Sequence, residues 1–100
     1  MRVALISPYP DITAYGVRAI AAYLKASGVA VRLIFLPDPL GDALTDAPER
    51  YPAAVMEQVA ALCADCELVG VSLMTNYVDN AVQITKAVKA RCAAPVLWGG

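Results

Sequence analysis

The chain has 100 residues, a formal net charge of −1, 59% hydrophobic residues and only 17% charged residues. This length allows one small domain, and the apolar fraction is too high for a disordered segment. Binding to a nucleic-acid backbone needs a basic surface, which the near-neutral charge argues against. The chain has no histidine, which excludes a Ser-His-Asp or Cys-His nucleophile pair, a His-rich zinc site and an imidazole proton shuttle.

The three cysteines indicate a reducing, cytoplasmic compartment, because an odd count in so short a chain does not make a disulfide framework. Cys63 and Cys66 invite a redox or metal interpretation, but they lie at the predicted end of a helix, where the helix dipole raises the pKa of a thiol. We expect them to be structural. No stretch approaches the roughly 20 apolar residues of a membrane-spanning helix, so we expect a soluble protein without membrane contact.

In chain order, the first half predicts a strand at 3–6, a helix and a second strand at 29–36. The helix begins near Gly16 and carries apolar residues at helical spacing, namely Val17, Ile20, Ala21 and Leu24. Gly28 stands where a left-handed cap of this helix is expected. The stretch 37–50, rich in proline and aspartate, predicts a long loop.

The second half predicts two more helix and strand pairs. Pro52 suits the first turn of a helix, whose apolar face carries Val55, Val59, Leu62 and Cys63. The apolar run 68–73 is typical of a strand buried on both faces of a parallel sheet. A third helix begins near Val78, with Val82, Thr85 and Val88 facing inward, and a fourth strand follows at 95–98.

This alternation of strands and helices predicts a three-layer α/β/α sandwich with a flavodoxin-like, Rossmann-like parallel sheet in the order 2-1-3-4. Open sheets of this kind normally continue with another crossover and strand. We therefore expect residues 1–100 to be one truncated domain of a longer protein, with a fifth strand missing.

Ligands of such sheets bind outside the carboxyl ends of the strands, which directs attention to residues 8–16, 74–77 and 99–100. Neither G-x-G-x-x-G nor G-x-x-x-x-G-K-[ST] is present, so the phosphate cradles of dinucleotide and P-loop sites are missing. A phospho-receiver domain needs acidic residues where Ser7 and Ser72 stand. A flavodoxin phosphate loop needs N–H donors, which the prolines after the first strand do not supply.

Three short motifs follow the predicted strands in register: Asp11-Ile12-Thr13-Ala14-Tyr15-Gly16, then Ser72-Leu73-Met74-Thr75-Asn76, then Trp98-Gly99-Gly100. Over its whole length the chain resembles the cobalamin-binding domain at the N-terminus of cobalamin-dependent radical SAM enzymes. That family has Asp-x-His-x-x-Gly, Ser-x-Leu and Gly-Gly at these places. Thr13 replaces the histidine that coordinates cobalt in other branches, and Met74 replaces the leucine. The radical SAM branch commonly lacks that histidine too.

The resemblance implies that the domain binds cobalamin without axial benzimidazole or histidine, through a pocket for the nucleotide tail. Gly99 and Gly100 would let the backbone approach the tail ring, and Ser72 would donate a hydrogen bond to a ring nitrogen. Thr75 and Asn76 would reach the ribose or the phosphate. The full set of cofactor-binding residues implied is Asp11, Thr13, Tyr15, Gly16, Ser72, Met74, Thr75, Asn76, Gly99 and Gly100.

The corrin would lie above residues 11–15, with Thr13 or Tyr15 facing the lower side of cobalt. The resemblance implies no catalytic or metal-ligating residue in this domain. It implies a partner, a radical SAM domain later in the same chain, with S-adenosylmethionine and a [4Fe-4S] cluster. The parent protein would be a methyltransferase or a related enzyme.

Two alternatives stay open. In the first, the chain is a non-catalytic flavodoxin-like domain used for protein interaction. In the second, it is a nucleotide-binding domain or a small enzyme that uses Asp11, Ser72 and Asn76. The local features also have plain structural explanations: Gly16 starts a helix, Ser72 satisfies a backbone group, and Gly99-Gly100 forms a turn.

Overall fold

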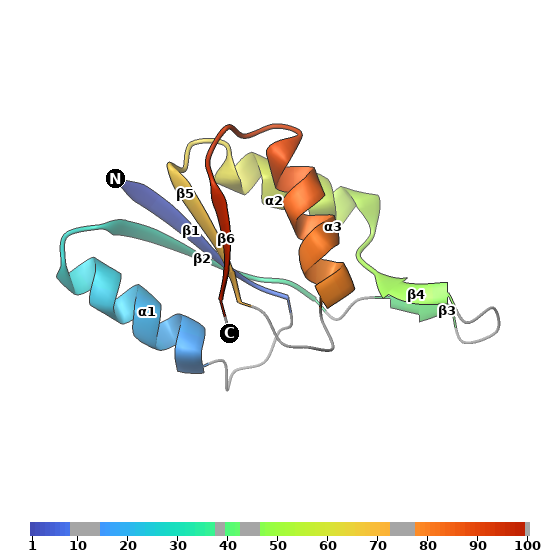
Figure 1. The fold of residues 1–100 in the computed structure, drawn as a ribbon, viewed down its shortest axis with the longest axis horizontal. Coiled ribbons are helices and arrows are strands. Elements are labelled where there is room, and N and C mark those ends of the chain that lie inside the picture. Colours follow the sequence, from blue (N-terminus) through green and yellow to red (C-terminus); the bar gives the residue numbers. More distant parts are fainter. Residues whose placement is uncertain (9–14, 38–39, 43–46, 73–77, 100) are drawn as a thin grey trace.

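The computed structural model describes residues 1–8, 15–37, 40–42, 47–72 and 78–99. Its elements are β1 (Arg2–Ser7), α1 (Tyr15–Ala26), β2 (Ala30–Phe35), β3 (Leu40–Asp42), β4 (Ala47–Arg50), α2 (Ala53–Cys63), β5 (Leu68–Ser72), α3 (Val78–Lys89) and β6 (Val96–Gly99). Figure 1 shows them as a central sheet with helices on both sides and a small hairpin at one end.

The central sheet has four strands in the order β2-β1-β5-β6, and every neighbouring pair is parallel. This confirms the predicted flavodoxin-like α/β architecture with strand order 2-1-3-4. The register places Leu33, Leu5, Gly70 and Leu97 side by side across the four strands. Because side chains alternate along a strand, these four residues belong to the same face of the sheet.

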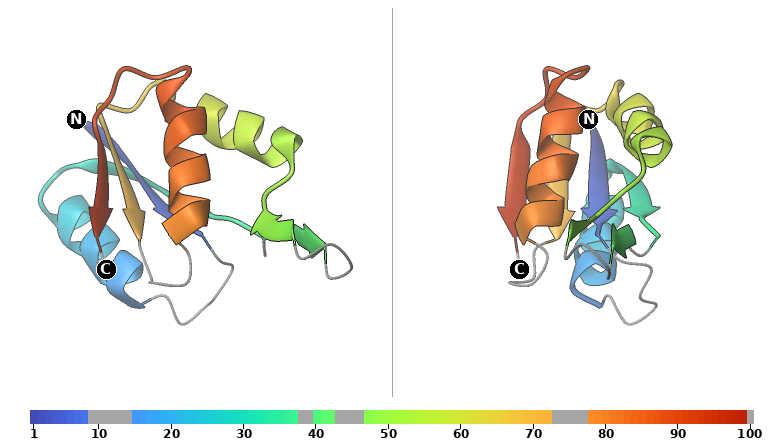
Figure 2. Two further views of the ribbon diagram at one scale, coloured as in Figure 1. Left: turned by 45° about the vertical axis from the view of Figure 1, so that its right-hand side comes forward. Right: turned by 90° about the vertical axis from the view of Figure 1, so that its right-hand side faces the viewer.

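The two faces are covered unequally. Helix α1 lies on one face and contacts β1 and β2, whereas α2 and α3 pack against each other on the other face (Figure 2). The main core fills the space between the sheet and α2 and α3, with Ile6, Val69, Val71, Ile84 and Val88 nearly or fully buried. On the α1 face, β5 and β6 lie beyond the strands that the helix contacts.

The prediction of which residues form the inner face of α2 is partly wrong. The buried residues of this helix are Met56, Val59, Ala60 and Cys63, whereas Leu62 is 43% exposed. Because 100° separates successive helical positions, Leu62 falls outside the stripe centred on Val59 and Cys63. In α3 the stripe is Asn80, Ala81, Ile84 and Val88, and the predicted inward residues Val82 and Thr85 are only half-buried.

The stretch 37–50, predicted as a long loop, contains a short antiparallel hairpin of β3 and β4. Strands of three and four residues are too short to give an alternating apolar pattern, and proline and aspartate obscured them. The chain after the hairpin is fastened to the body through Tyr51, whose buried hydroxyl donates to the Pro8 carbonyl. The Gln83 side-chain amide also pairs with the Tyr51 backbone, accepting from its N–H at 3.1 Å and donating to its carbonyl at 3.0 Å.

The end of α1 confirms the predicted role of Gly28. This residue has φ +86°, in the region that favours glycine. The Gly28 N–H donates to the Lys25 carbonyl, and the Val29 N–H donates to the Leu24 carbonyl at 3.0 Å. This is the Schellman arrangement, and it turns the chain directly into β2.

The cysteines lie near the amino ends of the strands. Cys63 and Cys66 are buried and Cys92 is half-buried, and the Cys92 thiol donates to the Cys63 carbonyl at 3.2 Å. Burial, with a smaller contribution from the neighbouring Cys66, raises the pKa of Cys63 to about 12. Burial also raises the pKa of Cys66. Among the described residues, no cluster of three metal-ligating side chains is present.

An exposed ion-pair network lies at the same edge of the sheet, near the amino ends of the strands. Asp65 accepts from Arg2 and also from Arg32, the latter at 2.9 Å. The hydrogen bond from Arg32 holds the pKa of the Asp65 carboxyl below its usual range. These contacts link the starts of β1 and β2 to the end of α2. None of the helices within the described ranges is long and apolar enough to cross a bilayer.

The packing predicts that Ile84→Ala destabilises the protein strongly. Ile84 is 0% exposed between α3 and the sheet, and truncating a buried isoleucine costs about 2–5 kcal/mol. Urea denaturation followed by circular dichroism measures this loss. Tyr23→Ala is the control, because Tyr23 is 73% exposed and its removal should change the free energy of unfolding by at most about 0.5 kcal/mol. Equal losses in the two variants would contradict the assignment of the core to the α2 and α3 side.

The thiol environment predicts slow alkylation of Cys63. Only the thiolate reacts, and a raised pKa keeps the thiol protonated, so at pH 9 Cys63 should react with iodoacetamide on the order of 100-fold slower than in the urea-unfolded chain. Mass spectrometry of peptides gives the rate at each cysteine, with half-buried Cys92 as the internal comparison. Native and unfolded rates that agree at Cys63 would show that its thiol is not held in the core.

Candidate functional site

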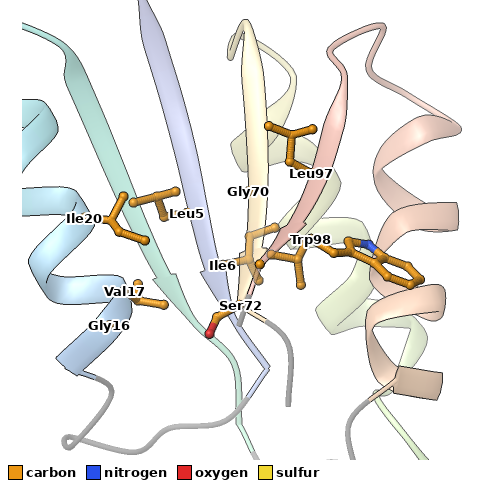
Figure 3. Close-up of a pocket in the computed structure, with 11 residues that line it drawn as sticks. Leu5, Ile6, Gly16, Val17, Ile20, Gly70, Ser72, Leu97 and Trp98 are labelled. Atoms are coloured by element: carbon orange, nitrogen blue, oxygen red, sulfur yellow. The ribbon is translucent and has the colours of Figure 1, made fainter. Parts of the chain in front are cut away.

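A groove of about 320 Å³ opens on the α1 side of the sheet, between α1 and the strands β1, β5 and β6. Leu5 and Gly70 belong to its floor, Val17 and Ile20 of α1 form one wall, and Leu97 of β6 lies at the opposite edge (Figure 3). The volume is at the lower end of the range of about 300–1,000 Å³ that is typical of small-molecule pockets.

Three of the predicted cofactor-binding residues line this groove: Gly16, Ser72 and Gly99. Gly16 is in the first turn of α1, Ser72 ends β5 and Gly99 ends β6. Ser72 and Gly99 are direct neighbours in the register of the two strands. The parallel topology therefore gathers residues from three separate parts of the sequence at the carboxyl edge of the sheet, as the sequence predicted.

The other predicted residues cannot be placed in the same way. Tyr15 is the first residue of α1, and its side chain is not described. The remaining six lie outside the described residues, namely Asp11, Thr13, Met74, Thr75, Asn76 and Gly100. Their predicted contacts with the corrin, the ribose and the phosphate stay predictions.

The glycines of the groove differ in what surrounds them. A Cβ atom built on Gly16 or on Gly99 meets nothing within 4 Å, whereas one on Gly70 would lie 3.0 Å from Leu5 Cδ2. Packing within the described chain therefore does not require glycine at 99. Glycine does matter at position 70, because the Leu5 side chain rests against the bare backbone there. A larger residue at 70 would push Leu5 into the groove.

Ser72 is the polar side chain of the described lining. It is half-buried, and the described part of the chain offers no hydrogen-bond partner to its hydroxyl. Figure 3 shows the hydroxyl at the lower end of the groove, on the side of α1. A hydroxyl in this position can donate to or accept from a bound molecule.

Sequence reasoning missed most of the apolar lining. Ile20 belongs to the apolar spacing predicted for its helix, but its side chain is 53% exposed where it lines the groove, and Leu97 is 58% exposed across from it. Gly70 carried a usable signal, because glycine inside a strand often marks a close backbone approach. The Trp98 indole points away from the groove toward α3, where its Nε1 donates to Thr85 Oγ1 at 2.9 Å (Figure 3).

The described lining of the groove carries no charged side chain. Arg18, the residue after Val17 in α1, has its guanidinium 4.9 Å from the centre of the Phe35 ring and is not part of the described lining. This surface therefore suits a flat, largely apolar group with one or two hydrogen-bonding atoms near Ser72. It offers little to a bare phosphate.

Comparison of the chain with protein-family models, with curated proteins and with solved structures finds no match. The fold and the groove are thus the observations from which a function has to be argued.

Proposed function

We propose that the chain binds cobalamin with its lower base detached from cobalt, and that the nucleotide tail occupies the groove beside α1. The observation that carries this proposal is the convergence of Gly16, Ser72 and Gly99 on one apolar groove. Those residues belong to three separate sequence motifs that resemble the cobalamin-binding family.

The shape and chemistry of the groove fit a flat aromatic base. The position of a Cβ at Gly99 is open space, so a ring can approach the backbone of β6 there. At Gly70 the Leu5 side chain covers the backbone and gives the groove an apolar floor. Val17, Ile20 and Leu97 offer apolar contacts to the faces and edges of such a ring. Burying apolar surface there is favourable by about 25 cal/mol per Å².

Ser72 supplies the polar contact of this arrangement. When benzimidazole leaves cobalt, its ring nitrogen becomes a free acceptor, and burying it without a partner would cost about 1–3 kcal/mol. The Ser72 hydroxyl lies at the carboxyl edge and can donate to such a nitrogen. Releasing the base from cobalt is thereby offset by one hydrogen bond and by apolar contact.

The corrin would then lie outside the carboxyl edge of the sheet. Bound cobalamin supplies a cobalt centre for methyl-transfer or radical chemistry. We propose that this domain presents the corrin to a radical SAM domain later in the same protein, which would provide S-adenosylmethionine and a [4Fe-4S] cluster. The parent protein would be a cytoplasmic methyltransferase or a related enzyme, and this domain would hold the cofactor without itself turning over substrate.

A second candidate function is protein interaction. Ile20 and Leu97 are more than half exposed on the same surface, and neighbouring exposed apolar side chains are typical of protein contacts. A nucleotide-binding role is less well supported, because the described lining lacks the cations or the cradle of N–H groups that phosphates require.

Titration with hydroxocobalamin separates these functions. If the tail enters the groove, the absorption spectrum of the corrin should change to that of the form without axial benzimidazole, and the change should saturate. An unchanged spectrum, or saturable binding with benzimidazole still on cobalt, would contradict the tail-pocket proposal. The interaction function predicts no spectral change with any corrinoid.

Gly99→Val should weaken this binding by roughly ten-fold or more, because its side chain would occupy the space proposed for the ring. The thermal midpoint should stay close to that of the unmodified chain, since a Cβ at this position meets no atom of the described residues within 4 Å. Ala93→Val is the matched control, because it adds similar bulk at an exposed position before β6. An unchanged affinity of Gly99→Val would show that the tail does not lie against this backbone.

A further inference from the structure

We propose that the groove selects the chemical type of the lower base and prefers 5,6-dimethylbenzimidazole to a purine such as adenine. This inference rests on the proposed function and deepens it, because it concerns which cobamides the same site accepts. It is argued from the order of polar and apolar residues along the groove.

The groove is polar at its mouth and apolar farther in. Ser72 and Gly99 end their strands at the carboxyl edge, where a tail from a corrin outside that edge would enter. Gly70 and Leu97 lie two residues back along β5 and β6, level with Leu5 of β1. Ile20 lies one helical turn beyond Gly16 on the facing side of α1. Figure 3 shows this second level above Ser72.

A base entering from the carboxyl edge would place its five-membered ring, which carries the ribose and the cobalt-binding nitrogen, near Ser72. Its six-membered ring would then reach the level of Leu5, Ile20 and Leu97. In dimethylbenzimidazole the outer edge of that ring carries two methyl groups. In adenine the same ring carries two nitrogens and an amino group.

At the inner level, formed by Leu5, Ile20 and Leu97, the outer edges of the two six-membered rings would have different interactions. Methyl groups would contact the apolar side chains that line it, and one methyl group in an apolar pocket contributes roughly 10- to 200-fold to discrimination. Where the edge of the adenine ring lies against these side chains, its nitrogens and amino group would exchange water for apolar contact, and the described side chains of this level offer them no hydrogen-bond partner. Both effects favour dimethylbenzimidazole.

Gly70 controls how far a base can enter. Leu5 Cδ2 would lie 3.0 Å from a Cβ at position 70, so the Leu5 side chain packs over the bare backbone of Gly70, and a larger residue there would displace Leu5 into the groove. The selection thus depends on Gly70 and Leu5 for depth and on Ile20 and Leu97 for apolar contact.

The experiment compares cobamides in their dicyano forms. Cyanide occupies both axial positions of cobalt, so neither lower base has to leave the metal and only the tail contacts differ. Equilibrium dialysis in excess cyanide gives dissociation constants of the chain for dicyanocobalamin and for its adenine analogue. Dicyanocobinamide, which lacks the nucleotide tail, measures how much the corrin contributes alone. We expect dicyanocobalamin to bind roughly ten-fold or more tightly than the adenine form, and the cobinamide to bind more weakly than dicyanocobalamin.

A pair of variants at the inner level tests the cause. Leu97→Asn places an amide where adenine needs a hydrogen-bond partner and should reduce the preference several-fold, whereas Leu97→Met keeps the surface apolar and should preserve it. Because Leu97 is 58% exposed, both variants should keep their fold, and thermal midpoints check this directly. A preference that Leu97→Asn leaves unchanged would overturn the assignment of selection to the inner level.

The outcomes separate this inference from the proposed function. Equal dissociation constants for the two dicyano forms, both tighter than that of the cobinamide, would overturn the selection and leave tail binding intact. Absence of binding by all three corrinoids, or equal binding of all three, would overturn the tail-pocket function and the selection with it.

Discussion

A parallel sheet has two faces that must be removed from water, and this requirement governs the structure. On one face, α2 and α3 bury Ile6, Val69 and Val71 in a continuous core. On the other face a single helix contacts β1 and β2. The α1 side of β5 and β6 is therefore left with exposed apolar residues, and the groove is a direct result of this uneven cover. In parallel sheets such exposure is uncommon, which distinguishes this part of the described surface from the rest of the sheet.

The same uneven cover explains which features of the fold were predictable. Strands and helices with a complete apolar stripe are predictable from sequence. The Gly28 cap is predictable because a glycine directly after such a helix marks a left-handed cap, and its φ of +86° agrees. The sheet order followed from the helix crossovers and from the central apolar run of β5. The β3–β4 hairpin was not recognised, since its strands are too short for a periodic pattern. Leu62 was misassigned because an apolar residue on the flank of a helix looks the same in sequence as one at the centre of the stripe.

The site was predictable where topology alone determines position. Ser72 and Gly99 end adjacent parallel strands, so their proximity follows from strand order. The apolar level behind them was not predictable, because it depends on where α1 lies across the sheet and which strands it leaves open. Ile20 illustrates this: its spacing in the sequence indicates a core position, but its side chain is 53% exposed and lines the groove.

The residues that line the groove also help to decide between its two candidate occupants, a protein partner and a small planar ligand. A protein partner would need a broad surface, of the order of 800 Å² on each side for a stable complex, and Ile20 and Leu97 alone do not provide one. A flat ring needs much less area, but it requires close approach to the backbone and one polar contact at its edge. Gly99 and Ser72, which are direct neighbours across β5 and β6, meet these two requirements. Glycine at 99 admits close approach by a ring or by another backbone, so it is the small apolar area of the groove that favours a small planar ligand over a polypeptide.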